Sequence, residues 1–206
     1  MKHTFVCIAH TTGAGAEEMA GLVAERLDFR LLDEEILLQA AESAGVGPEE
    51  VADVEQRKSF LVRVANDMLE RGIGSAYGPI IPQPAGPKRA ELRDHIREAI
   101  EESTADGPAV IVAHGASIAL GGRDDVLRVL VTASPETRAG RLEREAGLER
   151  SEATKLVKES DAARAAYLKD FYDVDRELPT SYDLVVNTDR LTAEEAADLV
   201  VHALKL

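Results

Sequence analysis

The sequence has no tryptophan, only four tyrosines and four phenylalanines, and a single cysteine. One cysteine cannot form a disulfide within the chain, and Cys7 lies in an apolar run, where a small buried residue is commoner than a reactive thiol. The scarcity of aromatic residues leaves the core to alanine, leucine, valine and isoleucine. No apolar run has the length of a signal peptide or a membrane span, so we expect a cytoplasmic protein with no membrane partner.

Basic residues are also in the minority. The chain has 24 lysines and arginines against 38 aspartates and glutamates, which gives a net charge of −14. This balance argues against nucleic-acid binding, which needs a basic surface. A length of 206 residues with 45% hydrophobic and 30% charged residues suits one globular domain over residues 1–206. Nothing in the sequence indicates the oligomeric state.

Five short apolar runs alternate with amphipathic stretches along the chain. The runs are residues 5–9, 29–32, 109–113, 126–133 and 183–188. The stretches that predict helices are residues 17–27, 34–43, 48–71, 89–103, 135–146, 151–171 and 192–204. Continuous apolar runs separated by helices are typical of a parallel sheet that is buried on both faces. We therefore predict an α/β fold, with a five-stranded parallel sheet covered by helices on both faces.

The turn after the first apolar run is a candidate phosphate site, because ligands of open parallel sheets bind beyond the carboxyl ends of the strands. Its glycines allow the backbone to pass close to an anion, and the N–H groups of the next helix favour phosphate. The candidate binding residues of this turn are Thr11, Thr12, Gly13, Ala14 and Gly15.

The turn departs from both common glycine-rich motifs. Against G-x-x-x-x-G-K-[ST], His10, Ala16 and Glu17 replace the first glycine, the lysine and the hydroxyl residue. Against G-x-G-x-x-G, Glu18 replaces the third glycine. A glutamate about 6 Å from a phosphate costs roughly 2–3 kcal/mol at an effective dielectric constant near 20, so this pair of glutamates opposes anion binding.

A group of arginines in the predicted helix 135–146 is a second candidate, with Arg138, Arg141 and Arg144 spaced three residues apart. Arg164 and Lys169 follow in the next predicted helix. Phosphoryl transfer needs cations around the transferred group, and mobile helices that bear arginines supply them while excluding water. The alternative is a solvated helix face, on which the arginines pair with nearby glutamates, Glu143 and Glu145.

Three further polar residues follow apolar runs. Asp33 is either the N-cap of the next helix or a functional carboxylate. His114 is either a hydrogen-bonded structural residue or, when protonated, a pH-dependent contact to phosphate. His10 has the same two interpretations.

Taken in order, these segments resemble the cytidylate kinase-like family, within the P-loop nucleoside monophosphate kinases. The matching stretches are IAHTTGAGAEEMAGLVAERL, FRLLDEEILLQAA, AVIVAHGASIAL, VLRVLVTASPETRAGRLEREAGL, ESDAARAAYLKDFY and SYDLVVNTDRLTAEEAADLV, within residues 4–54 and 108–202. The resemblance implies a kinase fold with a helical insertion for the nucleoside monophosphate at residues 54–103 and an arginine-bearing lid at 138–172. Residues 72–87, with four of the eight prolines, predict a mobile loop in the insertion.

The resemblance implies transfer of the γ-phosphoryl group of ATP to CMP or dCMP, assisted by Mg²⁺. Gly13, Ala14 and Gly15 would surround the donor phosphates, and Asp33 would face the acceptor or organise the metal shell. The lid residues Arg138, Arg141 and Arg164, with Lys169 as a further candidate, would neutralise phosphates. We assign no direct metal ligand.

The chain also departs from the family pattern. A Ser-Arg-Glu-like stretch before the glycine turn and an arginine after it are replaced by Ala9, His10, Thr11 and Glu17. After the third run, Ala113, His114 and Ser117 stand where the family has Gly-Arg and then Asp. Three hypotheses follow: an active nucleotide kinase, a weak or inactive relative that binds a nucleotide or phosphate as a regulatory module, or a protein whose closed anion site leaves it to act through an interface.

Overall fold

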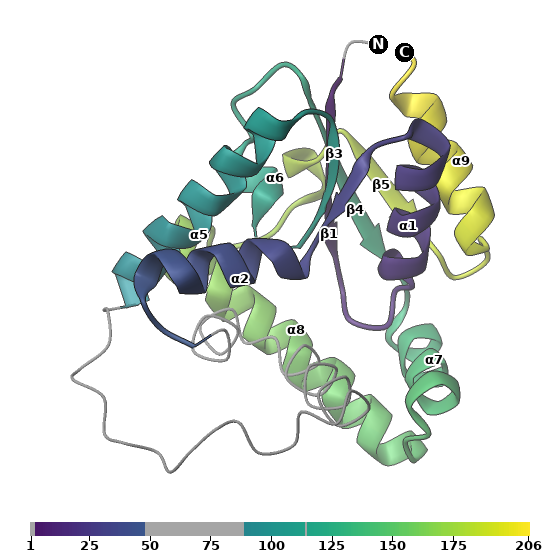
Figure 1. Ribbon diagram of the computed structural model, residues 1–206. Helices are drawn as coiled ribbons and strands as arrows, with labels where there is room; N and C mark the ends of the chain where they lie inside the picture. Colours follow the sequence, from purple (N-terminus) through teal and green to yellow (C-terminus); the bar gives the residue numbers. More distant parts are fainter. Residues whose placement is uncertain (1–2, 48–88, 114) are drawn as a thin grey trace, which may run out of the picture.

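The structure is a computed structural model that describes residues 3–47, 89–113 and 115–206. Five strands form one parallel sheet in the order β2-β3-β1-β4-β5 (Figure 1). The strands are β1 (Phe5–His10), β2 (Arg30–Leu32), β3 (Ala109–Val112), β4 (Val126–Thr132) and β5 (Leu184–Asn187). The predicted five-stranded parallel sheet is therefore confirmed.

In the described part of the chain, six helices follow the predicted ranges to within a few residues, and the short helix α6 was not predicted. The helices are α1 (Ala16–Leu27), α2 (Glu34–Ala44), α5 (Arg89–Ser103), α6 (Ala116–Ala119), α7 (Pro135–Ala146), α8 (Arg150–Tyr172) and α9 (Ala193–Ala203), with short 3₁₀ turns η1 (Thr104–Asp106) and η2 (Pro179–Ser181). The predicted helix 48–71 and loop 72–87 lie outside the described residues, as does His114. Of the predicted insertion 54–103, the structure describes α5.

Helices cover both faces of the sheet (Figure 1). On one face, apolar side chains of α1 and α9 pack against the sheet, with Val6 and Ile8 of β1 at the centre of this cluster. On the other face, α2, α5 and the end of α8 pack against the sheet, where Phe5 and Cys7 of β1 are buried. Alternate residues of β1 thus enter opposite clusters, which explains why this strand is apolar throughout.

Cys7 is fully buried in the second of these clusters. Burial raises the pKa of its thiol to about 12, so the thiolate form is disfavoured. The structure therefore agrees with the interpretation of this residue as a small core side chain. Within the described ranges, none of the helices has both the length and the apolar character that crossing a membrane requires.

The central position of β1 determines where a site can form. Its first residue, Phe5, is in register with Ala109 of β3 and with Val126 of β4. The carboxyl end of β1 therefore lies between the ends of two neighbouring strands, and the residues that follow it, 11–15, are here called the first loop. Ligand sites of open parallel sheets lie at this edge.

Candidate functional site

The first loop is a tight turn that leads from β1 into α1. Gly13 and Gly15 have left-handed backbone angles, with φ of +79° and +73°, and the N–H group of Ala14 donates to the carbonyl of Thr11 at 3.0 Å. A Cβ atom on Gly13 would lie 2.9 Å from the backbone oxygen of Arg138. Glycine is needed at position 13 both for the backbone angle and for the close approach of α7.

Arg141 of α7 holds the first loop in this position. Its guanidinium donates to the carbonyl of Gly13 at 3.3 Å and to the side-chain and backbone oxygens of Thr188 at 2.9 and 2.6 Å. The hydroxyl of Thr188 donates in turn to the carbonyl of Ala14 at 2.8 Å. Arg141 and Thr188 therefore satisfy backbone carbonyls of the first loop and hold its turn in place.

Arg138, also on α7, is buried and paired. It is 3% exposed, and it forms two parallel hydrogen bonds to the carboxylate of Asp161 on α8, at 2.8 and 2.6 Å. A longer hydrogen bond of 3.4 Å reaches the carbonyl of Thr12. Such a bidentate pair fixes the plane of the guanidinium and links the two helices of the predicted lid.

Arg164 of α8 forms a second bidentate pair, with Glu177, at 2.9 and 2.6 Å. The hydroxyl of Tyr182 donates to the same carboxylate. Burial alone would raise the pKa of Glu177, but the hydrogen bonds and charge of Arg164, with the Tyr182 hydroxyl, hold it below its usual value. Burial and the carboxylate together raise the pKa of Tyr182 to about 12. The cluster is therefore an ionised pair with a neutral tyrosine.

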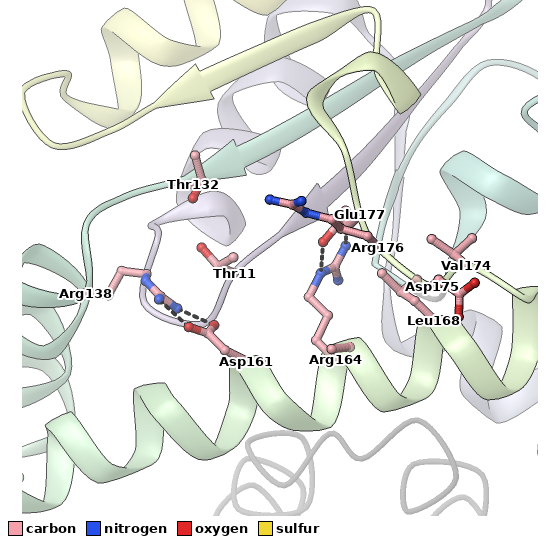
Figure 2. A pocket seen from close by; sticks show the side chains of 11 residues that line it. Thr11, Thr132, Arg138, Asp161, Arg164, Leu168, Val174, Asp175, Arg176 and Glu177 are labelled. Carbon is pink, nitrogen blue, oxygen red and sulfur yellow. Dashed lines mark hydrogen bonds and ion pairs between the residues drawn. The ribbon is translucent and has the colours of Figure 1, made fainter.

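A cavity of about 380 Å³ lies between the first loop, α8 and the segment that follows α8 (Figure 2). Its lining residues are Thr11, Thr132, Arg138, Asp161, Arg164, Ala165, Leu168, Val174, Asp175, Arg176 and Glu177. The structure thus brings together three residues that the sequence singles out, Thr11, Arg138 and Arg164. They come from three separate elements, β1 with its loop, α7 and α8.

Two polar atoms at this cavity are buried and, within the described residues, have no hydrogen-bond partner: the Thr11 hydroxyl oxygen and the Arg138 Nε. Each has an N–H or O–H to donate. Unsatisfied buried donors are rare in folded proteins and commonly mark a position that a water or a ligand completes. An acceptor with several oxygens is the ligand that would satisfy both.

Residues 5–190 match the cytidylate kinase-like family. The chain belongs to this family. A cytidylate kinase from Methanocorpusculum labreanum is 31% identical over 74 residues, which are 36% of this chain and 42% of that protein. The match therefore spans about two fifths of the relative's length.

Solved structures with the same fold have low sequence identity to this member of the cytidylate kinase-like family. An uncharacterized protein from Eubacterium ventriosum aligns with a TM-score of 0.69 at 14% identity and covers 98% of this chain and 99% of that one. Shikimate kinase from Bacteroides thetaiotaomicron aligns with a TM-score of 0.53 at 15% identity, over 98% and 99% of the two chains. These likenesses agree with the P-loop kinase fold that the family resemblance implies.

Other predicted site residues lie outside the cavity lining. Asp33 follows β2, which β3 separates from β1, and occupies the N-cap position of α2 without a capping hydrogen bond from its side chain. Asp33 thus has the N-cap position that one of its two interpretations predicts, without the side-chain hydrogen bond that usually stabilises such a cap. Lys169 is exposed and pairs with Asp175 at 2.9 Å. His10 ends β1, with its Nε2 atom 4.0 Å from a carboxylate oxygen of Glu17.

The alternative of a solvated arginine face is wrong for Arg138 and Arg141, because both side chains turn inward, toward α8 and the first loop. Glu143, one of the expected partners, pairs instead with Arg150 at 3.3 Å. Arg144 is exposed at the end of α7 and fits the solvated interpretation.

Sequence reasoning missed Asp161 and Glu177, the carboxylates that hold Arg138 and Arg164, and Tyr182, which donates to Glu177. It also missed Arg176, which lines the cavity from the irregular segment after α8. Thr188, the partner of Arg141, ends the last apolar run directly after β5, at the sheet edge where the rule for parallel sheets places ligand sites. No comparable local signal marks the others, since their importance arises from contacts across the fold.

Proposed function

We propose that this protein transfers the γ-phosphoryl group of ATP to a nucleoside monophosphate, with CMP or dCMP as the acceptor. The observation that supports the proposal most is the shared cavity, which Thr11 at the start of the first loop, Arg138 of α7 and Arg164 of α8 line together. Phosphoryl transfer depends on positioning and on cations around the transferred group, and both kinds of group meet here.

In this proposal, the backbone of Gly13, Ala14 and Gly15 surrounds the donor phosphates, with Thr11 and Thr12 at the entrance of the loop. Arg138 and Arg164 bind phosphate oxygens, and each exchanges a carboxylate partner for phosphate to do so. A guanidinium suits this exchange, because phosphate and carboxylate oxygens accept the same pair of parallel hydrogen bonds. Arg141 keeps the loop in shape. His114, outside the described residues, remains a candidate phosphate contact.

Magnesium fits this site only as a partner of the nucleotide. Among the described residues, no group of three or more histidine, cysteine, aspartate and glutamate side chains could hold a metal ion. Magnesium in such enzymes commonly rests on one or two carboxylates and the substrate phosphates. Asp33 is the carboxylate that the family resemblance offers for its shell. The ion would offset negative charge on the phosphates during transfer.

A second candidate function is a regulatory module that binds a nucleotide or phosphate without turnover. It is favoured by Ala16 at the position of the usual loop lysine, by the exposed Glu17 and Glu18 at the start of α1, and by the carboxylates that already occupy Arg138 and Arg164. In this protein the released carboxylates would remain beside the phosphate and oppose its binding.

The deciding experiment is a calorimetric titration with ATP and with CMP, with and without Mg²⁺, followed by an ADP-release assay with CMP, dCMP, UMP and AMP as acceptors. A kinase binds both nucleotides and releases ADP only with Mg²⁺ and an acceptor. Binding without ADP release supports the regulatory module, and no binding contradicts both functions. The variant Arg138→Lys is the control for contaminating kinases, because it keeps the charge but loses bidentate contact and must lower any genuine turnover.

A further inference from the structure

We propose that Arg176 is the residue that neutralises bound phosphate in this cavity, where it takes the part of the lysine that the first loop lacks at Ala16. The inference rests on the proposed function in that it concerns the same cavity and a phosphate-bearing ligand. It concerns binding, however, and holds whether or not the bound nucleotide is turned over.

The charges of the cavity lining lead to this residue. The lining contains three arginines and three acidic residues, so their formal charges cancel. Two arginines are held by two of the carboxylates, Arg138 by Asp161 and Arg164 by Glu177. The third carboxylate, Asp175, is bound by Lys169, which lies outside the lining. Among the described residues, no carboxylate pairs with Arg176, so this arginine keeps an unpaired positive charge in the lining.

The position of Arg176 suits a ligand contact. It follows α8 in the segment before η2, and its side chain is exposed. Figure 2 shows this side chain extended over the cavity toward the side that Thr11 and Thr132 line. In the described part of the chain it makes neither a hydrogen bond nor an ion pair, so no contact with these residues has to break before it binds an anion. Arg138 and Arg164 must each first leave a bidentate carboxylate.

The groups around Arg176 favour an acceptor-only ligand. Thr11 and Arg138, which line the same cavity, each offer a buried donor atom that has no partner among the described residues. A guanidinium adds five further N–H donors in one plane. A phosphate or polyphosphate supplies oxygens for all of these groups at once, whereas a neutral ligand would leave the charge of Arg176 unmatched.

The test is calorimetric titration of the full chain with pyrophosphate and with ATP. Arg176→Ala is expected to weaken both by about tenfold or more, since hydrogen bonds to charged groups are the stronger ones. Arg176→Lys should fall between this variant and the unaltered protein, because it keeps the charge without the planar pair of donors. Arg97→Ala, which removes an exposed arginine of α5 outside the cavity lining, is the matched control and should bind as the unaltered protein does.

Thermal melting accompanies the titrations, and Arg176→Ala should melt within about 1 °C of the unaltered protein, because an exposed side chain with no partner among the described residues contributes little to stability. The assignment is overturned if Arg176→Ala binds pyrophosphate within twofold of the unaltered protein, or if the unaltered protein does not bind pyrophosphate. If the expected affinities appear but no acceptor yields ADP, the proposed kinase activity fails and the assignment stands. If Arg176→Ala retains both affinity and ADP release, the assignment fails and the kinase activity stands.

Discussion

Replacement of Gly13 by alanine is expected to destabilise the protein because it forces the first loop away from α7. Two costs combine at this position. An alanine with a left-handed φ, here +79°, costs about 1–2 kcal/mol. The new methyl group would also lie 2.9 Å from the Arg138 carbonyl oxygen and 3.2 Å from its Cβ, an overpacking that costs about 1–3 kcal/mol.

The free energy of unfolding should therefore fall by about 2–5 kcal/mol. In a protein of this size, that loss lowers the melting temperature by about 4–20 °C. Circular dichroism during a thermal scan measures this shift directly. Because the loop must move to relieve the contact, the affinity for pyrophosphate should fall in the same variant.

Gly45→Ala is the matched control. Gly45 ends α2 with a φ of +67°, and no described atom beyond its chain neighbours would lie within 4 Å of an added Cβ. This variant should lose only the conformational part, about 1–2 kcal/mol, and should leave pyrophosphate affinity unchanged. The reasoning is refuted if the two variants melt at the same temperature, because the contact between the first loop and α7 would then contribute nothing.

Three further predictions concern the residues that hold the site. Glu177→Gln should lower the free energy of unfolding by about 1–3 kcal/mol at pH 7, measured by urea denaturation, because Arg164 loses its counter-charge; an unchanged midpoint would contradict the pairing. The difference in unfolding free energy between the unaltered protein and Glu177→Gln should shrink as the pH falls below 4.5, the ordinary pKa of a glutamate carboxyl. The fold lowers the pKa of Glu177, and its pair with Arg164 is lost once the carboxylate is protonated. A difference that widens in acid would contradict this sign. Thr188→Val removes the hydroxyl that joins Arg141 to the carbonyl of Ala14 and should lower the free energy of unfolding by about 1–3 kcal/mol. The control Thr154→Val, on the exposed face of α8, should lower it by less.

The regular elements could be predicted because their signals are local. The run 126–133 contains enough valine and leucine to indicate a buried strand, and β4 occupies Val126–Thr132. Helix α7 begins at Pro135, as predicted, after Ser134, whose hydroxyl accepts a hydrogen bond from the N–H of Thr137. Such capping depends on residues within one turn, so the sequence alone contains the information.

The partners of the arginines could not be predicted because they come from other elements. Spacing along α7 suggested Glu143 and Glu145 as partners, but Arg138 binds Asp161, 23 residues further along the chain. Arg141 binds Thr188, 47 residues away. Arg138 faces α8 and the first loop, and Arg141 faces the first loop and Thr188, because α7 packs there. Helical periodicity does not say what a polar face meets. Arg176 belongs to an irregular segment, which has no period from which to read its orientation.

The position of β1 at the centre of the sheet has a consequence for biosynthesis. Its first residue pairs with Ala109 and Val126, so a nascent chain exposes this apolar strand until residues more than a hundred positions later have been made. At about 5–20 residues per second, that interval lasts roughly 5–20 s. During it, β1 offers unpaired backbone groups to other nascent chains or to chaperones. The first loop is thus synthesised early but acquires its shape only after α7 and Thr188 have left the ribosome.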